Sequence, residues 1–340
     1  MLDRLRQPIT PAAYRKITMV SLVLLAAIVV TGAGVRLTGS GLGCTDWPRC
    51  TDETFTPSSD LHANIEFWNR MITGLVSAAV VAAVLGSLRR APRRRDLTWL
   101  SLGLVAGVLG QIVLGGIVVL THLNPWLVQG HFVLSMVLVA NAMVLTHRAG
   151  LPDGAEERPI VTPALLRWGW GLVGLATVVL LTGTLVTGSG PHSGKTRAPK
   201  DATLAQEISA AKEVKRLPIA VHDAARIHGA TVWLLLAATI WVLVQLRRHQ
   251  PDGPLPRRAT VLTTVILLQG AVGYTQYFTG VPPLLVALHI LGATLVWIAA
   301  LALALHLRAP VVAVDAGGAQ SVDGVEHPDP HPDGDLVSGR

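Results

Sequence analysis

The chain has 340 residues, of which 51% are hydrophobic and only 14% are charged. Together with a mean hydropathy of +0.49, this composition excludes an intrinsically disordered protein and most soluble folds. It predicts an integral membrane protein built from helices that lipid surrounds. Two cysteines are too few for a disulfide scaffold or a thiolate metal site. In a membrane protein, a formal charge of +7 indicates how the chain is oriented in the membrane before it indicates a nucleic-acid surface.

Apolar windows of about 20 residues mark candidate membrane helices. Eight such windows occur, at residues 17–37, 66–88, 98–120, 126–147, 168–188, 222–246, 260–279 and 284–307. We interpret the first as a membrane helix because no small-x-small cleavage pattern follows it. Beyond Pro310 the sequence has no hydrophobic periodicity and predicts a disordered tail, in which His327 and His331 are solvated and bind no metal.

The basic residues predict the orientation in the membrane. Of the 28 Lys and Arg residues, 18 fall on one face, in residues 1–16, 89–95, 148–167, 247–258 and the tail. Six of the others lie in the long loop 189–221, where the positive-inside rule is weak. Both termini are therefore expected in the cytoplasm, in a multi-pass protein of the cell membrane.

This orientation places Cys44 and Cys50 in the first outer loop, outside the reducing cytosol. The short separation, the turn at Pro48 and an oxidising compartment favour a disulfide. Two neighbouring free thiols are the alternative, and a redox role for the pair stays open.

An internal repeat organises the chain. Four residues recur at an offset of 158: Gln111, Gly115, Pro125 and His131 match Gln269, Gly273, Pro283 and His289. The Thr-Gly-Ser-Gly motif at 38–41 recurs at 187–190, an offset of 149. Because each half has four spans, the copies share one orientation and are related by an axis along the membrane normal.

The fold class expected is therefore all-α, with eight transmembrane helices in two tandem pseudo-symmetric four-helix bundles. The expected divisions are a cytoplasmic N-terminus at 1–16, an N-terminal bundle at 17–160 with its outer Cys loop at 38–64, a C-terminal bundle at 161–307, and a cytoplasmic tail at 308–340.

Ionisable residues inside membrane spans are costly and mark candidate functional sites. Near the outer ends of the spans, at one depth, lie Glu66, Arg70, His131, Arg226, His228 and His289. His228 and His289 begin two helices of the C-terminal half and could hold a haem iron from both sides. The alternative for each is a hydrogen bond to a carbonyl or water at the membrane interface. Zinc is disfavoured because no further carboxylate or histidine joins this pair at metal spacing.

In the N-terminal half, Asn69 falls where His228 stands: 62 residues separate Asn69 from His131, and 61 separate His228 from His289. An amide is a poor iron ligand, so we expect His131 as the one strong axial ligand, with an open or weakly filled sixth position. His62, about two turns from Asn69 on the same face, is a second-choice ligand.

Glu66 lies one turn before Asn69 on the same helical face. It is a candidate proton shuttle, and the alternative is a purely stabilising i,i+4 pair with Arg70. Three arginines near the outer edge could bind haem propionates or only anchor the interface, namely Arg36, Arg70 and Arg226.

The most specific stretch is Val-Arg-Leu-Thr-Gly-Ser-Gly-Leu-Gly-Cys at 35–44. With the outer Cys pair, the Glu66 to Arg70 segment and the histidines on even-numbered helices, residues 17–307 resemble the haem A synthases, membrane enzymes that oxidise haem O to haem A for the terminal oxidase. The resemblance implies a haem b cofactor, with its iron, on His228 and His289. It implies a haem O pocket at His131, Asn69 and Arg70, a catalytic role for Glu66, and a loop pair of Cys44 and Cys50. The family usually has histidine where Asn69 stands.

The implied chemistry converts a porphyrin methyl to a formyl group by successive hydroxylations. The implied partners are haem O, dioxygen or water, an unidentified electron donor, the lipid bilayer and the haem O synthase; a second copy of the chain is a further candidate, and nucleic acid is not. The haem sites and the Cys loop are expected toward the outer face. Two other classes compete: a di-haem cytochrome b-type electron-transfer protein, and a transporter whose histidines relay protons.

Overall fold

The computed structural model describes residues 7–44, 46–57, 59–191, 216–249 and 251–311. Within them, eight long helices carry the fold, as the all-α prediction requires. They are α2 (Pro11–Leu37), α3 (Leu61–Arg89), α4 (Arg95–Leu120), α5 (Pro125–Ala149), α6 (Pro163–Ser189), α8 (Val221–His249), α9 (Pro254–Phe278) and α10 (Pro283–Leu305). Each helix overlaps one of the eight predicted windows.

Seven of these helices are long and apolar enough to cross a membrane, which confirms the class of multi-pass membrane protein. The eighth long helix, α9, is outside that set. The basic residues Arg257 and Arg258 lie near its start, and Gln269 and Gln276 interrupt its apolar run further along.

Capping signals, not hydropathy, set the helix boundaries. Five of the helices, α2, α5, α6, α9 and α10, have proline in the first turn, where its fixed φ and missing N–H cost nothing. Thr10 and Thr162 cap α2 and α6 by accepting from Ala13 N and Leu165 N. The helices therefore begin up to several residues before the apolar windows.

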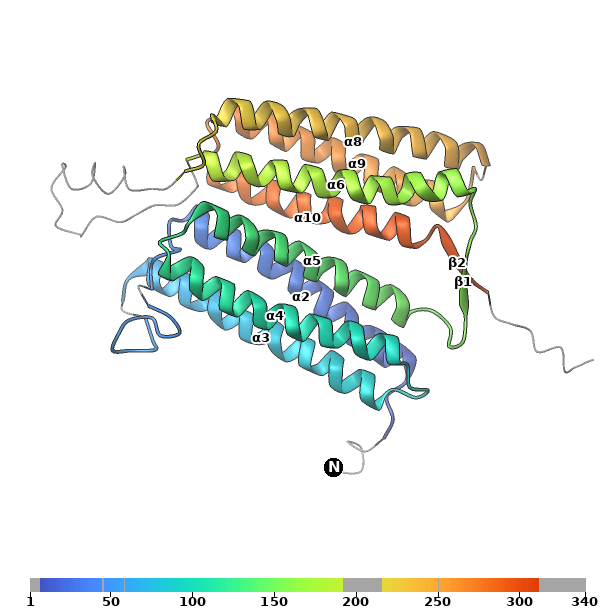
Figure 1. The fold of residues 1–340 in the computed structure, drawn as a ribbon, viewed down its shortest axis with the longest axis horizontal. Coiled ribbons are helices and arrows are strands. Elements are labelled where there is room, and N and C mark those ends of the chain that lie inside the picture. The colour runs from blue at the N-terminus through green and yellow to red at the C-terminus, as the bar shows by residue number, and fades with distance from the viewer. Residues whose placement is uncertain (1–6, 45, 58, 192–215, 250, 312–340) are drawn as a thin grey trace, which may run out of the picture.

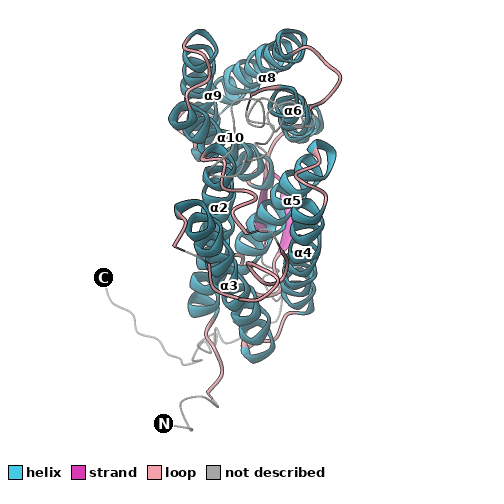
Figure 2. Ribbon diagram, turned by 90° about the vertical axis from the view of Figure 1, so that its left-hand side faces the viewer, coloured by secondary structure: helices cyan, strands magenta, loops and turns pink. Residues whose placement is uncertain are grey.

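Figure 1 shows α2, α3, α4 and α5 side by side in one half of the molecule and α6, α8, α9 and α10 in the other; Figure 2 shows the same division from another side. The halves meet where α10 packs on α2 and α5, and α5 on α6. The Trp297 indole N–H of α10 donates to Met136 O of α5 over 3.0 Å within this interface. Large apolar side chains such as Val23, Leu109 and Trp233 are exposed on the outer surface, as expected for side chains that face lipid.

A two-stranded antiparallel sheet joins the halves at the end opposite the Cys loop (Figure 1). Strand β1 (Glu156–Pro159) pairs with β2 (Arg308–Val311), with Glu156 opposite Val311. This sheet was not predicted, and β2 occupies the first four residues of the segment expected to be a tail. The rest of that segment, with His327 and His331, lies outside the described residues.

Beside the sheet lies a polar group that we call the sheet-end cluster: His147, Glu157 and His306. His147 Nε2 is 3.0 Å from Glu157 Oε1, and the rings of His147 and His306 meet edge to face with centroids 4.8 Å apart. The cluster therefore connects the end of α5, strand β1 and the residue that follows α10.

Candidate functional site

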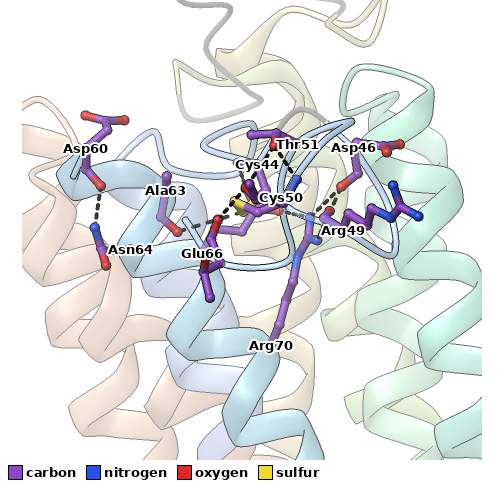
Figure 3. Close-up of a disulfide and its surroundings, with 12 residues drawn as sticks. Cys44, Asp46, Arg49, Cys50, Thr51, Asp60, Ala63, Asn64, Glu66 and Arg70 are labelled. Atoms are coloured by element: carbon purple, nitrogen blue, oxygen red, sulfur yellow. Dashed lines mark hydrogen bonds and ion pairs between the residues drawn. A yellow bond between two sulfur atoms is a disulfide. The ribbon is translucent and has the colours of Figure 1, made fainter. Parts of the chain in front are cut away.

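The Cys loop is fastened to the outer end of α3. Cys44 and Cys50 form a disulfide, which confirms the predicted pairing. The Cys44 N–H donates to Glu66 Oε2 over 2.9 Å, and Arg70 Nη2 donates to Glu66 Oε1 over 2.6 Å (Figure 3). Glu66 is only 5% exposed, so its carboxylate is a buried acceptor with both oxygens engaged.

Arg70 extends this attachment into the loop. Its Nη1 donates to Arg49 O over 3.0 Å and to Asp46 O over 3.3 Å, as Figure 3 shows. Both terminal nitrogens of the guanidinium are thus occupied by protein atoms. The Glu66–Arg70 pair is more than a contact along one helix, since it also holds the loop.

Two further contacts close the loop over the helix ends. Trp47 packs so tightly on α4 that a Cβ at Gly116 would lie 2.8 Å from Trp47 Cδ2. Ser40 Oγ is 2.9 Å from His62 Nδ1, so His62, the second-choice iron ligand, already contacts the segment that follows α2 through one ring nitrogen. The loop therefore packs against the outer ends of the helices of the N-terminal half.

In the C-terminal half the structure brings His228 of α8 and His289 of α10 together. Their ring centroids are 6.3 Å apart and their planes are inclined by 77°. Two imidazoles that bind one metal from opposite sides through bonds of about 2.0 Å place their centroids roughly 6 Å apart. The separation of the two rings therefore matches that of two imidazoles bound to one iron.

The hydrogen bonds around His228 suit a ligand as well. Its Nδ1 is 3.2 Å from Thr182 Oγ1 of α6. Thr182 donates its own hydroxyl hydrogen to the carbonyls of Val178 and Val179, so its oxygen is left to accept from Nδ1–H. That tautomer presents the Nε2 lone pair to a metal. Sequence reasoning missed Thr182, because its contact with α8 is tertiary.

Each of the three histidines lies against a glycine of the neighbouring helix. A Cβ at Gly183 would be 3.2 Å from His228 Cε1, one at Gly273 would be 3.0 Å from His289 Cε1, and one at Gly115 would be 3.3 Å from His131 Cε1. Glycine lets the imidazole approach the helix backbone closely. We call these contacts the glycine–histidine pairs.

His131 of α5 is held like His289 of α10. Gln111 Nε2 donates to His131 O over 3.1 Å, and the repeat-related Gln269 Nε2 donates to His289 O. Among the described residues, His131 Nδ1 and Asn69 Oδ1 are buried polar atoms without a hydrogen-bond partner. His289 Nδ1, at the repeat-related position of the other half, is likewise buried without a partner.

The arginines expected at the outer edge lie in different settings. Arg36 Nη2 contacts Thr187 O of α6 over 3.5 Å and so connects the two halves. Arg226 is exposed, and Arg70 holds the Cys loop. Within the described ranges, three or more His, Cys, Asp or Glu side chains do not gather into a group that could hold a metal ion; the candidate iron sites consist of paired or single imidazoles.

A family model described as cytochrome oxidase assembly protein, COX15-CtaA, matches residues 15–301. A heme A synthase of Exiguobacterium sibiricum is 28% identical over 172 residues, which is 50% of this chain and 57% of that protein. The heme A synthases of Alkalihalophilus pseudofirmus and Halalkalibacterium halodurans are each 25% identical over 273 residues, covering 79% and 78% of this chain and 85% and 87% of theirs. The chain belongs to the COX15-CtaA family of cytochrome oxidase assembly proteins.

Proposed function

We propose that this chain is a haem A synthase, a membrane oxidoreductase that oxidises a methyl group of haem O to the formyl group of haem A. The family match and the names of the relatives support this activity. The observation that carries the haem chemistry is the 6.3 Å separation of the His228 and His289 rings.

The proposed architecture is two tandem pseudo-symmetric four-helix bundles, at 17–160 and 161–307, with α9 as an eighth span. The matching bonds of Gln111 and Gln269 to the backbone of His131 and His289 support this symmetry. Both termini are proposed to be cytoplasmic, with the Cys loop outside. The presence of a disulfide in that loop supports an oxidising compartment.

In the C-terminal half, His228 and His289 would hold a haem b cofactor. When bound, this haem supplies one-electron transfer. Thr182 keeps the His228 ring in one orientation through Nδ1, and Gly183 and Gly273 let both rings stand close to the helix backbones. The packed helices α6, α8, α9 and α10 would supply its apolar surroundings.

In the N-terminal half, haem O is the substrate, and His131 would bind its iron while Gln111 orients the turn of α5 that carries His131. The Cys loop covers this half and excludes water from it, with Trp47 set on Gly116. Glu66 is the proposed catalytic carboxylate. Because both of its oxygens accept hydrogen bonds, a proton that binds Glu66 removes the negative charge that strengthens the bonds from Cys44 N–H and Arg70, so proton transfer there is coupled to the loop.

The proposal is tested by expression in a host that makes haem O but not haem A, followed by extraction and chromatography of the porphyrins. We expect haem A and its hydroxylated intermediate with the natural chain, and neither with the Glu66→Ala variant. Absence of both from cells in which the natural chain is folded and loaded with haem would refute the synthase and favour the di-haem cytochrome b-type protein. A folded, purified chain without any haem absorption would favour the transporter.

A further inference from the structure

Three of the four positions that the repeat assigns to iron ligands are glycine–histidine pairs, and the fourth differs. Gly34 of α2 stands 149 residues before Gly183, at the offset that relates the two Thr-Gly-Ser-Gly motifs. Its expected partner on α3 is Asn69, the counterpart of His228. The repeat therefore assigns Gly34 and Asn69 to the fourth position.

The space beside Gly34 on α2 is open. A Cβ at Gly34 would meet no heavy atom within 4 Å, whereas one at Gly183 would lie 3.2 Å from the His228 ring. The glycine that makes room for an imidazole has been kept, but the imidazole has been replaced by a shorter side chain. A Cβ at Gly34 therefore has open space in front of it at the position where one at Gly183 would meet an imidazole.

The N-terminal half also lacks a counterpart of the hydrogen bond that Thr182 makes with His228. Thr182 binds His228 Nδ1, and the residue at its place in α2 is Ala33. A methyl group cannot hold an imidazole by a hydrogen bond. The loss of the ring and the loss of its anchor agree, so this position is not arranged to receive another histidine of the chain.

Asn69 still brings a polar group to this space. Its Oδ1 is buried and, among the described residues, has no hydrogen-bond partner. Leaving such an atom unpaired is destabilising, and an apolar side chain of the same size would avoid this cost. An amide offers both a donor and an acceptor to a small polar ligand.

We propose that Asn69, Ala33 and Gly34 form a binding site for a small exogenous ligand of the substrate iron, on the face opposite His131. The ligand class is a neutral molecule of one or two heavy atoms, such as water or a diatomic gas, with the Asn69 amide as its hydrogen-bond partner. The inference rests on the proposed function, since it needs haem O in the N-terminal half.

Carbon monoxide is the probe, added to the dithionite-reduced, purified full-length protein carrying haem in both halves. We expect one of the two haems to bind it, because the iron between His228 and His289 has both axial positions filled. Gly34→Val should weaken binding at least tenfold by filling the space. Gly32→Val is the matched control: Gly32 lies on the same helix, also has open space at its Cβ, points to another face, and should leave the affinity unchanged.

Two changes at Asn69 test the other half of the site. Asn69→His should convert the substrate haem to a six-coordinate, low-spin spectrum and abolish carbon monoxide binding. Asn69→Leu keeps the size but removes the amide, so carbon monoxide should still bind while the infrared C–O stretching band shifts. An unshifted band would remove Asn69 from the site, and it would do so even if the Asn69→His variant failed to fold.

The outcomes separate this inference from the proposed function. Two haems with no carbon monoxide binding to the natural chain would overturn the ligand site and leave the synthase intact. Equal weakening by Gly32→Val and Gly34→Val would also overturn the site. A folded chain that takes up no haem would overturn the proposed function itself.

Discussion

The attachment of the Cys loop to Glu66 makes a prediction about when the loop opens. Replacing Glu66 by alanine removes the acceptor for the Cys44 N–H at 2.9 Å and for Arg70 at 2.6 Å. Hydrogen bonds to charged groups contribute about 1.5–3 kcal/mol each, and they are not additive. We therefore expect the loop to lose about 2 kcal/mol of local stability, which is roughly a thirtyfold rise in its open population.

Trypsin cleavage after Arg49 reports this opening. The Arg49 side chain is exposed, but the backbone around it is held by Arg70, which binds Arg49 O. When cleavage is slow compared with reclosing, its rate follows the open population, so Glu66→Ala should be cut about thirty times faster than the natural chain. Glu66→Gln keeps an acceptor for Cys44 N–H and loses only the charge, so about 1 kcal/mol and a roughly fivefold acceleration are expected.

Asp153→Asn is the matched control. Asp153 forms an ion pair of similar length with Arg90, at 2.7 Å, but at the end of the molecule that carries the sheet. It should leave cleavage at Arg49 unchanged in purified protein, as measured by the appearance of the new peptide end in mass spectrometry. The reasoning fails if Glu66→Ala accelerates cleavage no more than Asp153→Asn does.

Three further predictions concern the iron clamp, the sheet-end cluster and the disulfide. His228→Ala should abolish the low-spin haem b absorption with helicity by circular dichroism retained, while His249→Ala, at the far end of the same helix, should keep the spectrum; a low-spin spectrum in His228→Ala would exclude the clamp. Burial lowers the pKa of His306 from 6.5, so below pH 6.5 the unfolded state binds a proton more readily than the folded state does. The stabilisation should therefore be complete above pH 6.5 and decrease as the pH falls below it. His306→Gln should make Tm vary less between pH 8 and pH 5. Replacing both cysteines by serine opens a loop closed over a separation of 6 residues and should cost about 2 kcal/mol, seen as a lower Tm in detergent; an unchanged Tm would show that the other contacts of the loop hold it without the disulfide.

Hydropathy predicted the helices because lipid requires long apolar segments, and this requirement is local in sequence. The ends of α2 and α6 were less predictable, because Thr10 and Thr162 cap them outside the apolar windows. The β1–β2 sheet escaped prediction altogether. Its strands are only four residues long, and 148 residues lie between their nearest ends, Pro159 and Arg308.

The candidate site shows the same limit. The spacing of His131 and His289 in the repeat was enough to single out these residues, because a duplicated histidine is visible in the sequence. The contact of Thr182 with His228 Nδ1 and of Cys44 N–H with Glu66 could not be predicted. Both depend on how one element packs against another, and sequence distance carries no information about that.

The two halves differ in a consistent way once the repeat is applied to α3 and α8. At the offset that relates Asn69 to His228, Glu66 and Arg70 correspond to Ala225 and Gly229. The helix that keeps the second imidazole therefore lacks the acid and the base at these two positions, and the helix with Asn69 carries the pair that holds the Cys loop. Under the proposed function, electron transfer and porphyrin oxidation then need different helices: a saturated iron needs no proton donor, while a substrate that is oxidised needs a covered, polar place with an acidic group one turn away.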